Sequence, residues 1–222
     1  MNKSRKSILL NSVLATVGLF CYSFGVYLEI QANIGVAPWD ALNLGMVNTF
    51  GMMYGTANII VSFIVLAIDI LLRERIGIGM ILDAILVGKF VDLLNWLDLI
   101  PKQQNPIIGV PLLIVGMFIT GFSQYLYMKA SLGCGPRDSL LVGLARFMKK
   151  LPIGAVSVAI MATVTLAGWL LGGPIGLGTL LCAFLTGPIM QLAFKIVKFN
   201  ATAVEHQDLI TSFKIFSKNK SI

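Results

Sequence analysis

Long apolar runs, separated by short polar breaks, follow one another along almost the whole chain. A helix needs about 20 apolar residues to cross a bilayer, and six of these runs come close to that length. Two other apolar stretches are too short to span comfortably. The expected spans are 8–30, 55–72, 76–97, 107–128, 153–171 and 175–197, and the short segments are 35–50 and 136–148.

The order of runs and breaks occurs twice. The turn Gly-Val-Ala-Pro-Trp-Asp at 35–40 returns as Gly-Cys-Gly-Pro-Arg-Asp at 133–138, 98 residues later. Many surrounding positions are identical at this offset or, after one inserted residue, at an offset of 99. Examples are the pairs Gly18 and Gly116, Pro38 and Pro136, Gly55 and Gly154, and Gly88 and Gly187. A period this long indicates a duplicated half-protein and not a solenoid repeat.

The duplication divides the chain into five segments. They are a basic head at 1–7, a first membrane repeat at 8–97, a polar connector at 98–106, a second membrane repeat at 107–197 and a basic tail at 198–222. In the tail, Leu209, Phe213 and Phe216 recur at helical spacing, which is typical of an interfacial amphipathic helix. A solvated terminal segment explains the same composition equally well.

The composition excludes a soluble globular protein. Of the 222 residues, 57% are hydrophobic and 12% are charged, whereas soluble domains carry about 25% charged residues. We therefore expect a polytopic protein whose main partner is the lipid bilayer. The net charge of +7 is then a topology signal and not a nucleic-acid footprint. Three cysteines without a CxxC pair and one histidine predict no disulfide framework, no metal site and no catalytic triad.

Lysine and arginine predict the orientation, because they concentrate in cytoplasmic loops. With six spans, the 17 Lys and Arg residues fall on the side of the N-terminus, except Lys102 on the opposite side and Lys89 within a span. Both termini are therefore expected in the cytoplasm. Three spans in each half give the two halves opposite orientations, so the turn at 35–40 is expected to face the outside and the turn at 133–138 the cytoplasm.

These patterns predict an all-α polytopic membrane protein. Its six transmembrane helices would form two inverted three-helix repeats, each with a short re-entrant or interfacial helix. Inverted repeats that contain short or discontinuous helices are typical of secondary transporters, in which two related gates alternate around a site near the midplane.

The two turns hold the first candidate site residues. Asp40 and Asp138 fall in the first turn of a short helix, where a carboxylate either caps backbone amides or binds a ligand. Arg137 is either an anion contact or an ordinary cytoplasmic positive charge. Non-helical backbone at membrane depth lines wet cavities, so the turn amides are candidates for substrate contact. The turn residues are Gly35, Pro38, Gly133, Gly135 and Pro136.

The third expected span carries the densest charge, with Asp83, Lys89 and Asp92. Charges inside a membrane are costly and usually mark either a functional site or a neutralised structural pair, and both interpretations apply here. Lys89 and Asp92 are three residues apart, so they can pair on one helix face. The duplicate span has no charge at the matching positions. Glu29 and Asp69 lie near span ends and are expected to reach the interface.

The paired turns, in a duplicated chain of this length, resemble the YczE/YyaS/YitT group of bacterial membrane proteins, most closely its YczE-like branch. The resemblance covers about 14–192 and leaves the basic tail outside. It implies a multi-pass fold in the bacterial plasma (inner) membrane. It implies no catalytic residue and no cofactor.

Two functions agree with these observations. The first is a secondary transporter or permease-like protein for a small solute and a coupling ion, with the charged residues above along its path. The second is a non-transporting membrane partner or regulator that acts through its basic cytoplasmic face and tail. An enzyme is not expected, because the spans hold no nucleophile, metal set or paired bases. A homo-oligomer is compatible with either function.

Overall fold

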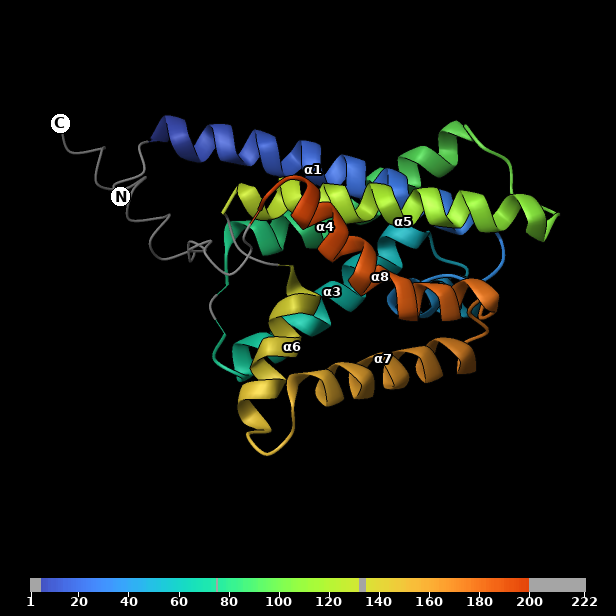
Figure 1. Ribbon diagram of the computed structural model, residues 1–222. Helices are drawn as coiled ribbons and strands as arrows, with labels where there is room; N and C mark the ends of the chain where they lie inside the picture. Colours follow the sequence, from blue (N-terminus) through green and yellow to red (C-terminus); the bar gives the residue numbers. More distant parts are fainter. Residues whose placement is uncertain (1–4, 75, 132–134, 200–222) are drawn as a thin grey trace.

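The chain is all-α in the residues that a computed structural model describes, which are 5–74, 76–131 and 135–199 (Figure 1). The helices are α1 (Arg5–Gln31), α2 (Pro38–Phe50), α3 (Tyr54–Leu71), α4 (Ile78–Leu97), α5 (Pro106–Lys129), α6 (Pro136–Phe147), α7 (Ile153–Leu170) and α8 (Leu177–Ile196). Each expected span and each short segment corresponds to one helix, with ends that differ by a few residues. The tail helix expected around Leu209 lies outside the described residues.

Proline sets where the two short helices begin. Pro38 and Pro136 are the first residues of α2 and α6, where a missing amide hydrogen breaks no helical bond. Gly51 ends α2 with a φ of 68°, in the left-handed region that glycine adopts without strain. The starting prolines are buried, whereas Phe50 and Phe147 at the other ends are exposed. The short helices therefore run from the interior to the surface and do not lie flat on the protein.

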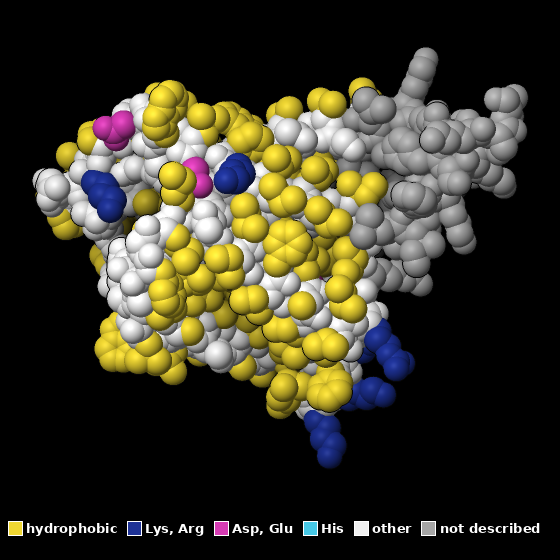
Figure 2. Space-filling view, turned by 180° about the vertical axis from the view of Figure 1, so that it is seen from behind, with side chains coloured by type: hydrophobic (Ala, Val, Ile, Leu, Met, Phe, Trp, Pro, Cys, Tyr) yellow, Lys and Arg dark blue, Asp and Glu magenta, His cyan; other side chains and the backbone are white. Residues whose placement is uncertain are grey.

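The surface and the helix lengths are those of a multi-pass membrane protein. Five described helices, α1, α3, α5, α7 and α8, are long and apolar enough to cross a bilayer. The 20 residues of α4 equal those of α8 in number but include three charged side chains. Apolar side chains cover much of the face in Figure 2, and a group of Lys and Arg side chains projects from one of its edges. An apolar surface of this extent is unfavourable in water and favourable in contact with lipid.

Helices α1 and α5 run antiparallel and pack closely along their length (Figure 1). Glycine permits the approach. A Cβ on Gly25 would lie 2.8 Å from the carbonyl oxygen of Gly116, and one on Gly18 would lie 3.0 Å from the amide nitrogen of Tyr127. Small residues let helix backbones come close in a membrane, where packing replaces the hydrophobic effect as the driving force.

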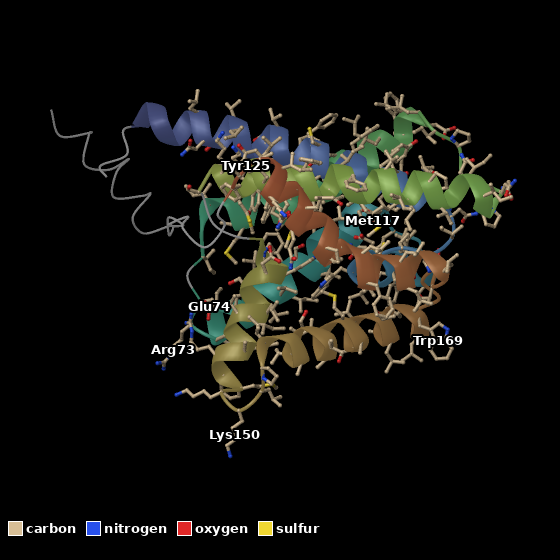
Figure 3. The ribbon with its side chains drawn as sticks, viewed as in Figure 1. Arg73, Glu74, Met117, Tyr125, Lys150 and Trp169 are labelled. Atoms are coloured by element: carbon tan, nitrogen blue, oxygen red, sulfur yellow. The ribbon has the colours of Figure 1, made fainter. Side chains whose placement is uncertain are left out.

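Two further interfaces join helices from opposite halves of the sequence. Helix α2 of the first half packs on α7 of the second, and α6 of the second half packs on α3 of the first. The two interfaces use equivalent residues. Gly45 of α2 lies against Leu171 at the end of α7. Its duplicate Gly143 of α6 lies against Leu72, which is the duplicate of Leu171, at the end of α3. Figure 3 shows Arg73, at the end of α3, and Lys150, just before α7, at the same end of the molecule.

One pair of interfaces does not match. Helices α3 and α4 pack together, and a Cβ on Gly88 would lie 2.7 Å from the Cα of Gly55. Their duplicates α7 and α8 make few contacts. Among the described residues, no atom lies within 4 Å of a Cβ placed on Gly154 or Gly187. The same pair of glycines is therefore in close contact in one half and apart in the other.

Candidate functional site

The first turns of α2 and α6 meet inside the molecule. An Nη atom of Arg137 lies 3.8 Å from Oδ1 of Asp40, and the guanidinium carbon lies 5.2 Å from the centroid of the Trp39 ring. The Asp40 side chain is 5% exposed and that of Arg137 is 22% exposed. A planar guanidinium suits both a carboxylate partner and an aromatic face. Although the sequence suggested turns that face opposite sides, both short helices start in the interior, so their side chains come into contact.

A buried hydrogen-bond network positions this ion pair. The Tyr54 hydroxyl donates to Oδ1 of Asp40 at 2.7 Å, and Nη2 of Arg137 donates to Oδ1 of Asn58 at 2.9 Å. Nδ2 of Asn43 donates to the same Asn58 oxygen at 3.2 Å. Asn43, Tyr54 and Asn58 are all buried. Because an unpaired polar group would be costly there, the network fixes the ion pair in one arrangement.

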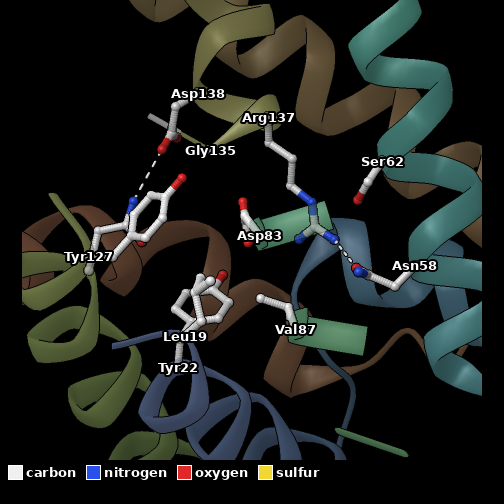
Figure 4. A pocket seen from close by; sticks show the side chains of 11 residues that line it. Leu19, Tyr22, Asn58, Ser62, Asp83, Val87, Tyr127, Gly135, Arg137 and Asp138 are labelled. Carbon is white, nitrogen blue, oxygen red and sulfur yellow. Dashed lines mark hydrogen bonds between the residues drawn. The ribbon is translucent and has the colours of Figure 1, made fainter. Parts of the chain in front are cut away.

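A cavity lies beside Arg137 (Figure 4). Its volume is about 80 Å³, several times the roughly 10–15 Å³ that one water molecule requires. The wall is formed by α1, α3, α4, α5 and the start of α6, and therefore by both halves of the chain. Besides Arg137, its polar side chains include Tyr22, Asn58, Ser62, Asp83, Gln124 and Asp138.

Two carboxylates face this cavity from different halves of the chain. A Cβ on Gly135 would lie 2.8 Å from Oδ2 of Asp83 and 3.6 Å from Oδ2 of Asp138, so both oxygens border the same space. Nε2 of Gln124 donates to Oδ2 of Asp138 at 3.1 Å. Among the described residues, neither carboxylate forms an ion pair. The structure thus brings together Asp40, Asp83, Arg137 and Asp138, four of the six charged residues singled out in the sequence.

The other two charged candidates, Lys89 and Asp92, lie outside the cavity. Oδ1 of Asp92 accepts a hydrogen bond from the amide of Gly55 at 2.8 Å, so this carboxylate binds the first turn of α3. Lys89 is exposed. No ion pair joins the two in the described part of the chain, so the pair that their spacing permits does not form there. A helix N-terminus presents free amides, and it holds Asp92 more directly than a neighbouring lysine on a flexible stem.

Glu29 and Asp69 do not reach the interface, contrary to the expectation from their position near span ends. Glu29 is 5% exposed, accepts from the Thr120 hydroxyl at 3.4 Å and lies 3.8 Å from the Cys182 sulfur. Asp69 is fully buried beside Ser139, and neither of its oxygens has a hydrogen bond of normal geometry in the described residues. Both are covered because neighbouring helices pack over them, which apolar patterning along a single helix does not indicate.

The first turn packs against the start of α8, and its residues Gly35 and Val36 also line a second cavity of about 100 Å³. Gly35 has a φ of 102°, and a Cβ on it would lie 2.6 Å from the amide nitrogen of Gly176. The carbonyl of Ile34 accepts a hydrogen bond from the amide of Gly178 at 2.7 Å. Gly133 of the second turn lies outside the described residues, whereas Gly135 and Pro136 are buried beside the cavity.

Sequence reasoning passed over Tyr54, Asn58, Ser62 and Gln124. A signal was available for two of them, because Asn58 and Ser62 lie one helical turn apart on an otherwise apolar span. Polar groups on one face of a membrane helix point toward the protein interior. In the described part of the chain, no group of three or more His, Cys, Asp or Glu side chains is placed to hold a metal ion.

Comparison with known proteins shows the family. Residues 9–195 match the "Family of unknown function (DUF6198)". The "Uncharacterized membrane protein YczE" of Bacillus subtilis (strain 168) is 31% identical over 191 residues, which cover 85% of this chain and 87% of that protein. The "Uncharacterized protein YyaS" of the same organism is 27% identical, over 82% of this chain and 91% of its own.

An "Uncharacterized protein" of Haemophilus influenzae (strain ATCC 51907 / DSM 11121 / KW20 / Rd) is 29% identical over 77% of each chain. No solved structure matches this chain. The matches to YczE and YyaS confirm the resemblance that the paired turns suggested. The chain belongs to the DUF6198 family.

Proposed function

We propose that the protein is a secondary transporter or permease-like protein for a small solute. The observation that carries this proposal is the meeting of α2 and α6, where Arg137 contacts Asp40 beside a polar cavity inside the bundle. Short helices that start at a central site are how many transporters present charge and helix ends to a solute. The first turns of both helices also bring partial positive charge into the interior.

In this proposal the chain has six spans in two inverted repeats, with both termini in the cytoplasm of a bacterial cell. The exchanged packing supports the inversion, because Gly45 on Leu171 and Gly143 on Leu72 form one interface twice with the halves swapped. The charges of α4 agree with a sixth span, since Asp83 faces the cavity and Asp92 binds α3. Lys and Arg gather in cytoplasmic loops, which agrees with the shared location of Arg73 and Lys150.

The unequal glycine contacts support alternation between two states. In the proposed topology α3 begins and α4 ends at the outside, so the contact between Gly55 and Gly88 closes the outer half. Gly154 and Gly187 belong to the cytoplasmic half, where they are apart. The structure is then an inward-facing state, in which the cavity near the start of α4 is on the cytoplasmic side. The second state would exchange the roles of the two glycine pairs.

Thiol labelling from each side of the membrane tests this function. The native cysteines, Cys21, Cys134 and Cys182, are replaced by serine, and the cavity residue Ser62 is changed to cysteine. Membrane-impermeant reagents are then added to right-side-out and inside-out vesicles. We expect fast labelling of Ser62→Cys from the cytoplasm and slower labelling from outside, because the outward-facing state is the minor one.

Two exposed positions serve as references for sidedness. Gln104→Cys in the connector is expected to label from outside, and Lys150→Cys from the cytoplasm. Labelling of both references from one side would exclude the inverted topology. If the references behave as expected and Ser62→Cys never labels from outside, no pathway crosses the protein. The non-transporting partner or regulator would then be the better interpretation.

A further inference from the structure

The charged groups around the cavity do not balance. Arg137 is paired with Asp40, which also accepts a hydrogen bond from Tyr54. Asp83 and Asp138 remain, and within the described residues neither has an ion-pair partner. With all four groups ionised, the site holds three negative charges and one positive charge. Asp83 is partly buried and Asp138 is exposed, so the excess negative charge lies at a cavity that solvent can reach. A hollow lined by one sign of charge attracts a ligand of the opposite sign, here a cation.

The groups that face the cavity accept hydrogen bonds in the way that an ammonium group requires. Oδ2 of Asp83 and Oδ2 of Asp138 border the same space beside Gly135. Ser62 is 4% exposed and lines the cavity, and its hydroxyl forms no hydrogen bond with another described residue. Figure 4 shows this hydroxyl directed toward Arg137 and the cavity. A buried hydroxyl without a protein partner needs one from a ligand or from water.

The rest of the wall favours an organic cation over a bare alkali ion. Tyr22 contributes an aromatic ring, and Leu19 and Val87 contribute apolar surface. Aromatic faces attract organic cations, and apolar walls suit alkyl groups. The volume of about 80 Å³ limits the ligand to a few non-hydrogen atoms. Resting on the transporter function above, we infer that the solute is a small organic ammonium ion held between Asp83 and Asp138.

Thermal unfolding of the full-length chain in lipid nanodiscs tests this inference, with methylammonium as the probe. A ligand that binds the folded state alone raises the unfolding midpoint by mass action. At ten times the half-saturating concentration, we expect a rise of about 3 °C. Sodium chloride at the same ionic strength is expected to give no saturable rise. Tetraethylammonium is too large for the cavity and is expected to give none either.

Two variants disturb the site in different ways. Asp83→Asn removes a charge, and it is expected to fold because the carboxylate makes no hydrogen bond with the described residues. Gly135→Ala keeps every charge but places a methyl group 2.8 Å from Oδ2 of Asp83, which displaces that carboxylate. The φ of Gly135 is −63°, a value that alanine adopts readily. Both variants are expected to lose the methylammonium shift.

Asp98→Asn is the matched control. Asp98 is exposed at the end of the same helix, α4, and asparagine tolerates its φ of 45°. This variant is expected to keep the shift. A shift that persists in Asp83→Asn, or that disappears in Asp98→Asn, would overturn the assignment. A saturable rise with sodium alone would replace it by an alkali-ion site, and a rise with acetate by an anion site at Arg137.

The thiol experiment separates this inference from the function on which it rests. Labelling of Ser62→Cys from both sides, without a methylammonium shift, would leave a transporter for another class of solute. A specific shift without labelling from outside would leave a cation site in a protein that does not transport.

Discussion

The same three positions behave differently in the two halves of the molecule. In the first half, Gly55 of α3 contacts Gly88 of α4, and Asp92 accepts a hydrogen bond from the amide of Gly55. We call these three residues the first clasp. In the second half the duplicate positions are Gly154, Gly187 and Gln191, which we call the second clasp. Within the described part of the chain its glycines have open space around them, and Gln191 is exposed.

Both halves have the residues needed for this contact, but within the described residues the structure forms it in the first half alone. Both clasps have two glycines that allow close approach and one side chain with an oxygen that can accept from an amide. One is closed and the other is open, while the other matched interfaces are formed in both halves. Under the proposed transport function, a contact that the sequence supports twice and the structure makes once is expected of a protein with two alternating states.

The largest expected effect comes from a disulfide across the second clasp. In a background without native cysteines, Gly154→Cys with Gly187→Cys is expected to cross-link on mild oxidation, because α7 and α8 approach in the second state. A disulfide requires Cα atoms closer than about 7 Å. Mass spectrometry of the intact chain and of its peptides identifies the bond. The control pairs Gly154→Cys with Leu180→Cys, an exposed position nearer the start of α8. Equal cross-linking of both pairs, or of neither, contradicts a specific second closure.

The unfolding midpoints of Gly55→Ala in α3 and Gly154→Ala in α7 compare how tightly the two clasps are packed. In Gly55→Ala, the new Cβ would lie 2.6 Å from the carbonyl oxygen of Gly88, and overpacking of this kind costs about 1–3 kcal/mol. For a chain of this size, we expect the unfolding midpoint to fall by about 2–4 °C per kcal/mol. Gly154→Ala has no clash and replaces a poor helix former, so its midpoint is expected to stay or rise slightly. Equal losses in the two variants would mean that α7 is packed as tightly as α3.

Helix positions in this protein follow from its sequence, whereas helix partners do not. Apolar runs and the prolines Pro38 and Pro136 predict every helix and the starts of α2 and α6, because hydropathy and a fixed φ act locally. The spacing of Lys89 and Asp92 predicts a shared helix face and permits an ion pair, but the described residues contain no such pair. Asp92 turns to the amide of Gly55, a donor from another helix that no pattern within α4 reveals.

The candidate site shows the same limit. The duplicated turns identified Asp40, Arg137 and Asp138, and charge inside an apolar run identified Asp83, since such groups rarely occur in a membrane without a role. Nothing in the sequence says that Arg137 contacts Asp40, because these residues belong to different halves and meet only when two short helices converge. Asn58 and Ser62 gave a weaker signal, since uncharged polar residues in spans are common.

Substitutions of Asp92 in the first clasp and of Gln191 in the second test whether the clasps control the equilibrium between the proposed inward-facing and outward-facing states. Asp92→Ala removes the acceptor for the Gly55 amide, which we expect to weaken the first clasp by about 1–2 kcal/mol. Outside labelling of Ser62→Cys is then expected to rise about tenfold for each 1.4 kcal/mol. Gln191→Ala is expected to lower outside labelling, because it weakens only the second state. A change in the same direction for both variants would contradict two alternating clasps.

The smallest expected effects concern contacts that both halves make. Arg146 and Asn48 are duplicates. Arg146 joins the end of α6 to the segment after α3, and Asn48 joins the end of α2 to the segment after α7. Arg146 lies 3.0 Å from Oε1 of Glu74, and Nδ2 of Asn48 donates to the carbonyl of Gly172 at 2.7 Å. The Arg146 side chain is 63% exposed, and exposed ion pairs contribute roughly 0–1 kcal/mol and weaken with salt.

Arg146→Gln is therefore expected to lower the unfolding midpoint by less than about 3 °C, with a smaller loss at high salt. Asn48→Ala is expected to cost a similar amount without dependence on salt, because its bond is uncharged. Unfolding midpoints measured at low and high salt compare the two. Small and similar costs would mean that these ties form a fixed frame in both states, within which only the clasps exchange. A loss for Arg146→Gln as large as that for Gly55→Ala would mean that α6 holds α3 in place. The closed first half would then depend on this tie and not on the contact between Gly55 and Gly88.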